Sequence, residues 1–70
     1  MFDLYKSFIR RRIKVKLNDN SSIEGDLISI DGYLNLALQH VLFYEEGIAE
    51  PFVFISCLVK GSNVDYIALR

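Results

Sequence analysis

The chain has 70 residues, so it holds one domain at most, and hydrophobic residues make up 51% of it. A domain this small buries a modest share of its surface, so we expect another chain to cover part of the apolar area. A single cysteine and a single histidine exclude an internal disulfide bond and a zinc shell built from these residues. The apolar runs are too short to cross a bilayer, which favours an intracellular protein without a membrane partner.

The net charge of −1 combines two oppositely charged parts of the chain. Residues 1–20 carry six basic and two acidic side chains, whereas residues 21–70 carry two basic and seven acidic ones. A protein that grips duplex DNA by its phosphates is positive over a whole face. Any contact with nucleic acid is therefore expected to be local.

Residues 1–10 predict a short helix whose apolar side includes Tyr5 and Ile9. Two helical turns are not stable alone, so this helix must dock on the rest of the chain. From Arg12 onward, apolar residues alternate with lysines up to Leu17, a pattern typical of a half-buried strand. A cluster of turn-forming residues follows at 18–21.

A second strand is predicted over residues 23–30, with Gly25 inside it. Glycine weakens a strand but permits the sharp bend that a small closed sheet needs. Asp31 and Gly32 predict a tight turn, after which a third strand begins at Leu34.

The remaining chain predicts two further strands and the loops that precede them. Residues 52–59 are apolar on both faces, so this strand requires cover on both sides. The pattern as a whole predicts an all-β domain spanning 1–70, with a short helix (1–10) and a strongly bent five-stranded antiparallel open barrel (12–69) in meander order. The unpaired edges of an open barrel recruit other chains, and head-to-tail contacts can close into rings.

In a meander, the turn after the second strand and the turn after the fourth lie at the same end of the sheet. This geometry gathers five residues suited to single-stranded nucleic acid: Asp31, Tyr33, Asn35, Lys60 and Asn63. An exposed aromatic ring can stack on a base, an Asn amide offers a donor and an acceptor, and a lysine supplies charge. Tyr33 and Asn35 are two positions apart and are expected on one face of the strand. The alternative is structural, with Tyr33 filling a strand and Asn35 stabilising a turn.

The order of these residues resembles the two motifs of the Sm and Sm-like (LSm) family. Residues 23–36 (IEGDLISIDGYLNL) are similar to the first motif: a strand glycine, then an acid, any residue, an aromatic, an apolar residue and Asn. Residues 57–67 (CLVKGSNVDYI) are similar to the second: an apolar residue, a base, glycine, small polar residues and an apolar strand. The likeness covers nearly the whole chain, and its details look closest to the second member of the eukaryotic Sm-like set.

This resemblance implies the Sm fold, an SH3-like barrel, in a seven-membered ring of Sm-like subunits joined by pairing of strand four to strand five. It implies that single-stranded, uridine-rich RNA threads the pore, in pre-mRNA splicing in the nucleus, in cytoplasmic mRNA decay, or in both. By motif match, Tyr33 stacks on a base and Asn35 reads its edge. Lys60 flanks the base, Gly61 and Ser62 shape the loop, and Asp31 orients Asn35. The resemblance implies no cofactor, metal or small-molecule substrate.

Three features depart from the family pattern. Lys60 stands where arginine is usual, and a point charge in place of a planar fork predicts a weaker or less selective pocket. The basic run 10–12 replaces a glycine-containing stretch and is either a solvated junction or a contact with RNA or a partner. Because the sequence ends at Arg70, functions of C-terminal tails in the family are expected to be absent.

An enzyme is not expected. Cys57 lies in an apolar strand as a small hydrophobic residue, and His40 has no evident acid or nucleophile beside it. Two alternatives to an RNA-binding subunit remain open: a structural ring subunit with little RNA contact, and an unrelated small barrel that binds its ligand as a monomer. Whether the ring contains identical or different chains is also open.

Overall fold

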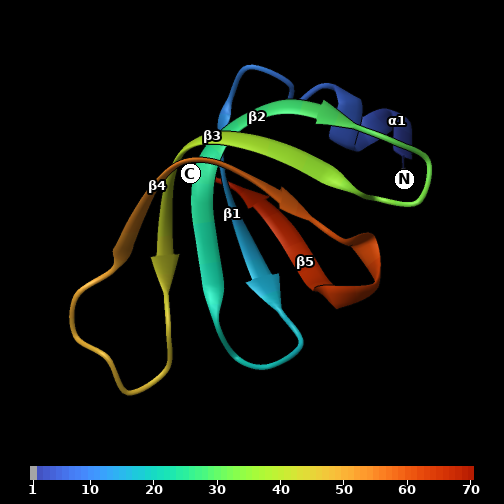
Figure 1. Cartoon of the computed structure of the whole chain (residues 1–70). Helices are drawn as coiled ribbons and strands as arrows, with labels where there is room; N and C mark the ends of the chain where they lie inside the picture. The colour runs from blue at the N-terminus through green and yellow to red at the C-terminus, as the bar shows by residue number, and fades with distance from the viewer. Residues whose placement is uncertain (1) are drawn as a thin grey trace.

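The computed structural model describes residues 2–70 and contains one short helix and one antiparallel sheet (Figure 1). The helix α1 spans Phe2–Lys6. The strands are β1 (Arg12–Leu17), β2 (Ser22–Ile30), β3 (Leu36–Tyr44), β4 (Phe52–Val59) and β5 (Val64–Leu69), with a short 3-10 turn η1 (Gly61–Asn63) before the last. This is the expected strongly bent five-stranded barrel with an N-terminal helix. In the described part of the chain, no helix has the length and apolar character needed to cross a membrane.

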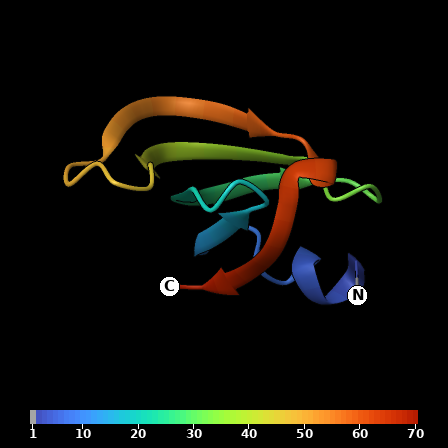
Figure 2. The ribbon, with the colours of Figure 1, turned by 90° about the horizontal axis from the view of Figure 1, so that it is seen from below.

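The sheet has the order β4-β3-β2-β1-β5. The first four strands form the expected meander, but β5 does not pair with β4. It crosses to the far side of the barrel and pairs antiparallel with β1, with Val15 opposite Ile67 (Figure 2). The prediction of a five-strand meander is therefore wrong at its last step, because η1 redirects the chain. As a consequence, β4 and β5 are the two open edges.

The bend in β2 lies where Gly25 was expected to permit it. A Cβ atom at Gly25 would lie 3.1 Å from the carbonyl oxygen of Gln39 and 3.2 Å from Cβ of Leu38, so β3 crosses this point in close contact. The register between β2 and β3 shifts between Glu24 and Asp26, and His40 adopts a positive φ of 54° at the same level of β3. The sheet is thus bent by a bulge on β3 that fits against a glycine on β2.

The core forms inside the bend. Its nine buried apolar residues come from all five strands: Ile13, Val15, Ile23, Leu27, Leu36, Leu38, Val41, Val59 and Ile67. Tyr5, Phe8 and Ile9 pack against this core, as the docked helix was expected to do. The helix itself ends at Lys6, and turns occupy residues 7–10, so it is shorter than the predicted 1–10. Met1 lies outside the described residues.

Candidate nucleic-acid interface

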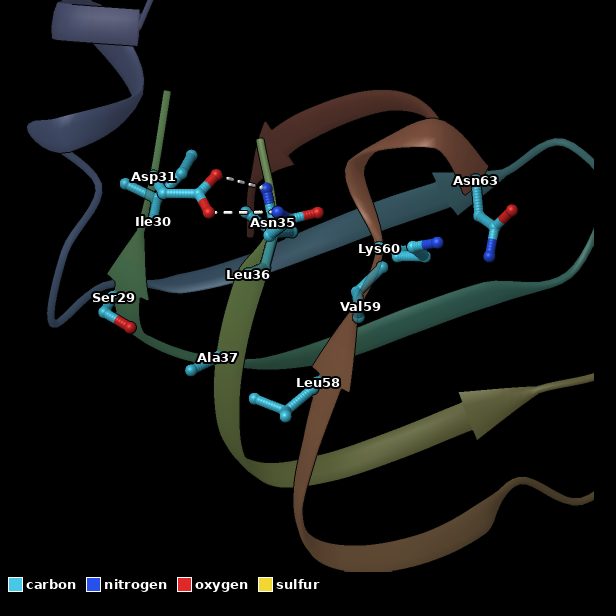
Figure 3. Close-up of a pocket in the computed structure, with 10 residues that line it drawn as sticks. All are labelled: Ser29, Ile30, Asp31, Asn35, Leu36, Ala37, Leu58, Val59, Lys60 and Asn63. Carbon is cyan, nitrogen blue, oxygen red and sulfur yellow. Dashed lines mark hydrogen bonds between the residues drawn. The ribbon is translucent and has the colours of Figure 1, made fainter. Parts of the chain in front are cut away.

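The loop between β2 and β3 is organised by one carboxylate. Asp31 Oδ1 accepts hydrogen bonds from the backbone N–H groups of Tyr33 (2.9 Å) and Asn35 (3.0 Å), and Asp31 Oδ2 accepts one from Asn35 Nδ2 (2.9 Å) (Figure 3). These bonds, with that of the Asn35 side chain foremost, hold the pKa of Asp31 below its ordinary value of 3.8. The carboxylate therefore stays charged at neutral pH and closes the loop.

The side chain of Asn35 joins this loop to the turn after β4. Its Oδ1 accepts a hydrogen bond of 2.8 Å from the backbone N–H of Gly61. The orientation of the amide is settled by its partners, since Oδ1 faces a donor and Nδ2 faces a carboxylate. An Asn amide can donate twice and accept twice, so one N–H and one lone pair of Asn35 remain available for a ligand.

Gly61 is required at this junction by a close approach of two backbones. A Cβ atom at position 61 would lie 1.9 Å from the carbonyl oxygen of Tyr33 and 2.9 Å from the carbonyl carbon of Leu34. The turn after β4 therefore rests directly on the Tyr33–Leu34 peptide. This contact places Lys60 and Ser62 beside the aromatic residue, although they are almost thirty positions away in the sequence.

A groove of about 730 Å³ lies between the two loops. Four of the five residues predicted to gather at this end, Asp31, Asn35, Lys60 and Asn63, line it together with an apolar wall that includes Ala37 and Leu58 (Figure 3). Tyr33, Gly61 and Ser62 are not among its lining residues. Tyr33 is 85% exposed, so its ring can contact a ligand.

The reason given for the common face of Tyr33 and Asn35 is wrong. Residues 31–35 form a loop, β3 begins at Leu36 rather than Leu34, and Leu34 has a positive φ of 63°. Strand alternation therefore does not apply to this pair. The loop brings the two residues together through the shared Asp31 carboxylate instead.

Sequence reasoning missed Asn18, which lies in the turn between β1 and β2 and contacts the turn after β4 directly. The side-chain Nδ2 of Asn18 donates to the carbonyl oxygen of Ser62 (2.9 Å). The backbone N–H of Asn18 donates to the carbonyl oxygen of Asn63 (2.9 Å). No local pattern signals these contacts, because they span more than forty residues. The apolar wall of the groove was missed for the same reason.

Two side chains with potential chemistry lie elsewhere. Cys57 is partly buried and packs against the core, and burial raises the pKa of its thiol, as suits a small hydrophobic residue. His40 was expected to lack an acidic neighbour, which is wrong: its Nδ1 lies 2.7 Å from Asp26 Oδ2. Arg12 completes this cluster by donating to Asp26 Oδ1 (3.3 Å) and to the carbonyl oxygen of His40 (2.9 Å). Across residues 2–70, no group of three or more His, Cys, Asp or Glu side chains could hold a metal ion.

Fold and site together define a class of protein: a small open barrel with two unpaired edges and a polar groove where two distant loops meet. The model of the LSM domain family matches residues 3–69, so the chain belongs to that family. This membership overturns the alternative of an unrelated barrel.

Two relatives show how the likeness is distributed. The U6 snRNA-associated Sm-like protein LSm6 of Mycosarcoma maydis is 34% identical over 65 residues, which are 93% of this chain and 75% of the relative. The probable U6 snRNA-associated Sm-like protein LSm2 of Dictyostelium discoideum is 35% identical over 69 residues, 97% of this chain and 59% of the relative. These identities are nearly equal, so the expected likeness to the second member stays a prediction.

Solved structures agree with the fold. The crystal structure of a heptameric archaeal Sm protein superposes with a TM-score of 0.86 at 28% identity and covers 97% of each chain. The P. aerophilum SmAP1 heptamer gives a TM-score of 0.89 at 27% identity, covering 100% of this chain and 92% of the other. The predicted Sm fold is thereby confirmed.

Proposed function

We propose that this chain is an RNA-binding subunit of a seven-membered Sm-like ring that binds single-stranded, uridine-rich RNA. One observation carries the proposal: the amide of Asn35 is held rigidly by Asp31 and Gly61, yet keeps one donor and one acceptor unused. The edge of uracil likewise presents an N–H donor beside a carbonyl acceptor. A preorganised amide is complementary to that edge at little cost in conformational entropy.

The neighbouring residues fit the same ligand. Tyr33 offers an exposed ring for stacking, which contributes about 1–3 kcal/mol per base. Lys60 lines the groove and supplies a positive charge for a base carbonyl or a phosphate. Asp31 acts through Asn35 and the loop backbone, while Gly61 and Ser62 shape the turn.

The ring follows from the open edges. Strands β4 and β5 have no partner on their outer side within the chain, and both carry exposed apolar side chains. Pairing of β4 of one subunit with β5 of the next removes both edges and covers this surface. The heptameric Sm structures that share the fold support a ring of seven.

The relatives also support a cellular role. Both are named as associated with U6 snRNA, which favours a small nuclear ribonucleoprotein that acts in pre-mRNA splicing in the nucleus. A cytoplasmic role in mRNA decay is the second part of the proposal and rests on the family resemblance alone. The function is binding, and it needs no cofactor or small-molecule substrate.

The test measures the affinity of the assembled protein for a fluorescent oligouridine by anisotropy, with oligoadenosine as a competitor. Replacing Tyr33 or Asn35 by Ala should weaken binding about tenfold or more, because a stacking or edge contact is lost. Tyr44→Ala is the matched control, since Tyr44 lies at the other end of β3. If Tyr33→Ala and Asn35→Ala leave the affinity unchanged in an intact assembly, the chain is a structural subunit and the proposal fails.

Lys60 gives a second readout of the same site. Lys60→Arg introduces the planar fork that the family pattern usually has, so it should strengthen oligouridine binding and sharpen the preference over oligoadenosine. A weaker or unchanged affinity would mean that Lys60 does not face the bound base.

A further inference from the structure

The groove between the two loops is larger than a single base requires. Its volume is about 730 Å³. Pockets of about 300–1,000 Å³ bury most of a drug-sized molecule, so this groove has room for a whole nucleoside and not only for its base. Its lining includes two polar side chains, Ser29 and Asn63, that have no part in the proposed contacts with uracil. Both are candidates for a contact with the sugar of a bound nucleotide.

Asn63 combines a fixed backbone with an unused side chain. Its backbone N–H donates to the carbonyl oxygen of Lys60 (2.9 Å), and its carbonyl oxygen accepts from the backbone N–H of Asn18 (2.9 Å). Among residues 2–70, the side-chain amide of Asn63 has no hydrogen-bond partner. Both N–H groups and both lone pairs of this amide are therefore available to a ligand.

The order of the polar residues along the groove favours Asn63 over Ser29. In Figure 3, Lys60 lies between Asn35 and Asn63, and Ser29 lies on the other side of Asn35. Ribose is attached to uracil away from the edge that Asn35 is proposed to contact, so the sugar extends from Asn35 along the groove. A phosphate beside Lys60 draws the sugar–phosphate backbone toward Asn63, because the positive charge lies on that side of the base.

We propose that Asn63 binds the 2′-hydroxyl of the nucleotide whose base is held by Asn35, and that this contact distinguishes RNA from single-stranded DNA. The inference rests on the proposed function and adds the sugar to the groups that the site reads. A ribose hydroxyl both donates and accepts hydrogen bonds, as an amide does, whereas deoxyribose has only C–H groups at this position. The contact of Asn35 with uracil cannot make the distinction, because oligodeoxyuridine presents the same base edge.

The chemistry of Asn63 suits a hydroxyl better than a phosphate. A phosphate oxygen only accepts hydrogen bonds, and the charged amine of Lys60 is a stronger partner for it than a neutral amide. A hydroxyl uses both halves of the amide, since it accepts from the N–H group or donates to the carbonyl oxygen. The backbone of Asn63 is already held, so binding restricts only the side chain.

The experiment is a double-mutant cycle between the amide of Asn63 and the 2′-hydroxyl. Fluorescence anisotropy measures the affinity of the assembled wild type and of assembled Asn63→Ala for oligouridine and for oligodeoxyuridine. The wild type should bind oligouridine at least about threefold more tightly, because a hydrogen bond is lost with the hydroxyl. Asn63→Ala should weaken oligouridine binding by a similar factor and leave the affinity for oligodeoxyuridine unchanged.

Two variants serve as controls for this cycle. Ser29→Ala removes a polar group that lines the same groove on the other side of Asn35, and Gln39→Ala removes an exposed amide of β3 outside the groove. Both should keep the wild-type ratio between the two affinities. Circular dichroism verifies that each variant is folded, and the hydrogen bonds of the Asn63 backbone do not use the atoms that Asn63→Ala removes.

Three results overturn the inference: a wild type that binds both ligands equally, Asn63→Ala that keeps the wild-type ratio, or Ser29→Ala that abolishes the preference. Each of them leaves the proposed function intact as long as Tyr33→Ala and Asn35→Ala weaken oligouridine binding. An assembly without affinity for oligouridine refutes the proposed function, and the inference with it.

Discussion

Strands β1 and β4 are both rich in apolar residues, but they use them differently. In β1, Ile13 and Val15 are fully buried, whereas Lys14 and Lys16, which alternate with them, are partly exposed. In β4, side chains on both faces are exposed, from 45% for Phe52 to 86% for Ile55 and Leu58. Strand β1 thus stabilises the single chain, whereas most of the hydrophobic surface of β4 stays exposed to solvent in the single chain.

The difference separates stability of the chain from assembly. The core residues of β1 and β3 contribute to the free energy of unfolding because they are already buried in the single chain. Residues on the outer faces of β4 gain that contribution only when another strand covers them. A substitution in the core should therefore mainly lower the free energy of unfolding, whereas a substitution of the same type on the outer face of β4 should mainly weaken assembly.

The largest effect is expected in the core. Leu38→Ala removes a side chain that is 1% exposed and should lower the free energy of unfolding by about 2–5 kcal/mol. Leu58→Ala, the matched change at a side chain that is 86% exposed, should alter it by less than about 0.5 kcal/mol. Urea denaturation of the dissociated chain measures both, and comparable losses would contradict the division between the buried core, here represented by Leu38 of β3, and the exposed edge strand β4.

The next effect concerns the junction of the two loops. Gly61→Ala places a Cβ atom against the backbone of Tyr33 and Leu34, and the required displacement should cost about 1–3 kcal/mol in unfolding free energy. Gly32→Ala is the control, because an added Cβ there meets no atom within 4 Å. Thermal unfolding compares the two variants. Equal melting temperatures would show that the turn does not need to rest on the β2–β3 loop.

Local patterns predicted most of the fold. Alternation in 12–17, the glycine in the second strand and the apolar run 52–59 each correspond to a strand or bend of the structure, because side-chain period and backbone freedom are local properties. The pairing of β5 with β1 could not be predicted in this way, since a turn of three residues redirects the strand and its partner lies about fifty residues away.

The candidate site was predicted in composition but not in geometry. Asp31, Asn35 and Lys60 do line one groove, yet the reason is a carboxylate that closes a loop, not alternation along a strand. The positive φ of Leu34 has no sequence signal, because leucine seldom adopts it. The support from Asn18 depends on a tertiary contact with Ser62, which no local sequence pattern indicates.

A smaller effect tests the exposed face of β4 directly. Ile55→Ser should leave the unfolding free energy of the dissociated chain within about 0.5 kcal/mol and raise the concentration needed for assembly severalfold. Ile28→Ser is the control, because Ile28 is also exposed, at 43%, but lies on the interior strand β2. Sedimentation equilibrium measures the difference, and a larger effect on assembly from Ile28→Ser would place the interface elsewhere.

The smallest effect concerns the carboxylate of Asp31 and is read from the pH dependence of stability. Hydrogen bonds from Asn35 and from the loop backbone lower the pKa of Asp31 below 3.8, so folding favours its charged form. Its contribution to stability is complete above the unfolded pKa near 3.8 and is lost as the pH falls through the lower pKa of the folded chain. Asp19 and Asp26 also have lowered pKa values, chiefly through hydrogen bonds from Ser21 and His40, and they add to the same acid loss.

Asp31→Asn should therefore make the fall in stability below about pH 4 shallower. It should also lower stability at pH 7, because the NH2 group that takes the place of Oδ2 cannot accept the hydrogen bond from Asn35 Nδ2. Asp3→Asn removes an exposed carboxylate of α1 and serves as the control. Urea midpoints measured at each pH give the slope for the wild type and both variants. If Asp31→Asn leaves the slope unchanged while Asp3→Asn reduces it, the carboxylate at position 31 does not hold the loop, and the rigid Asn35 amide on which the RNA site depends loses its support.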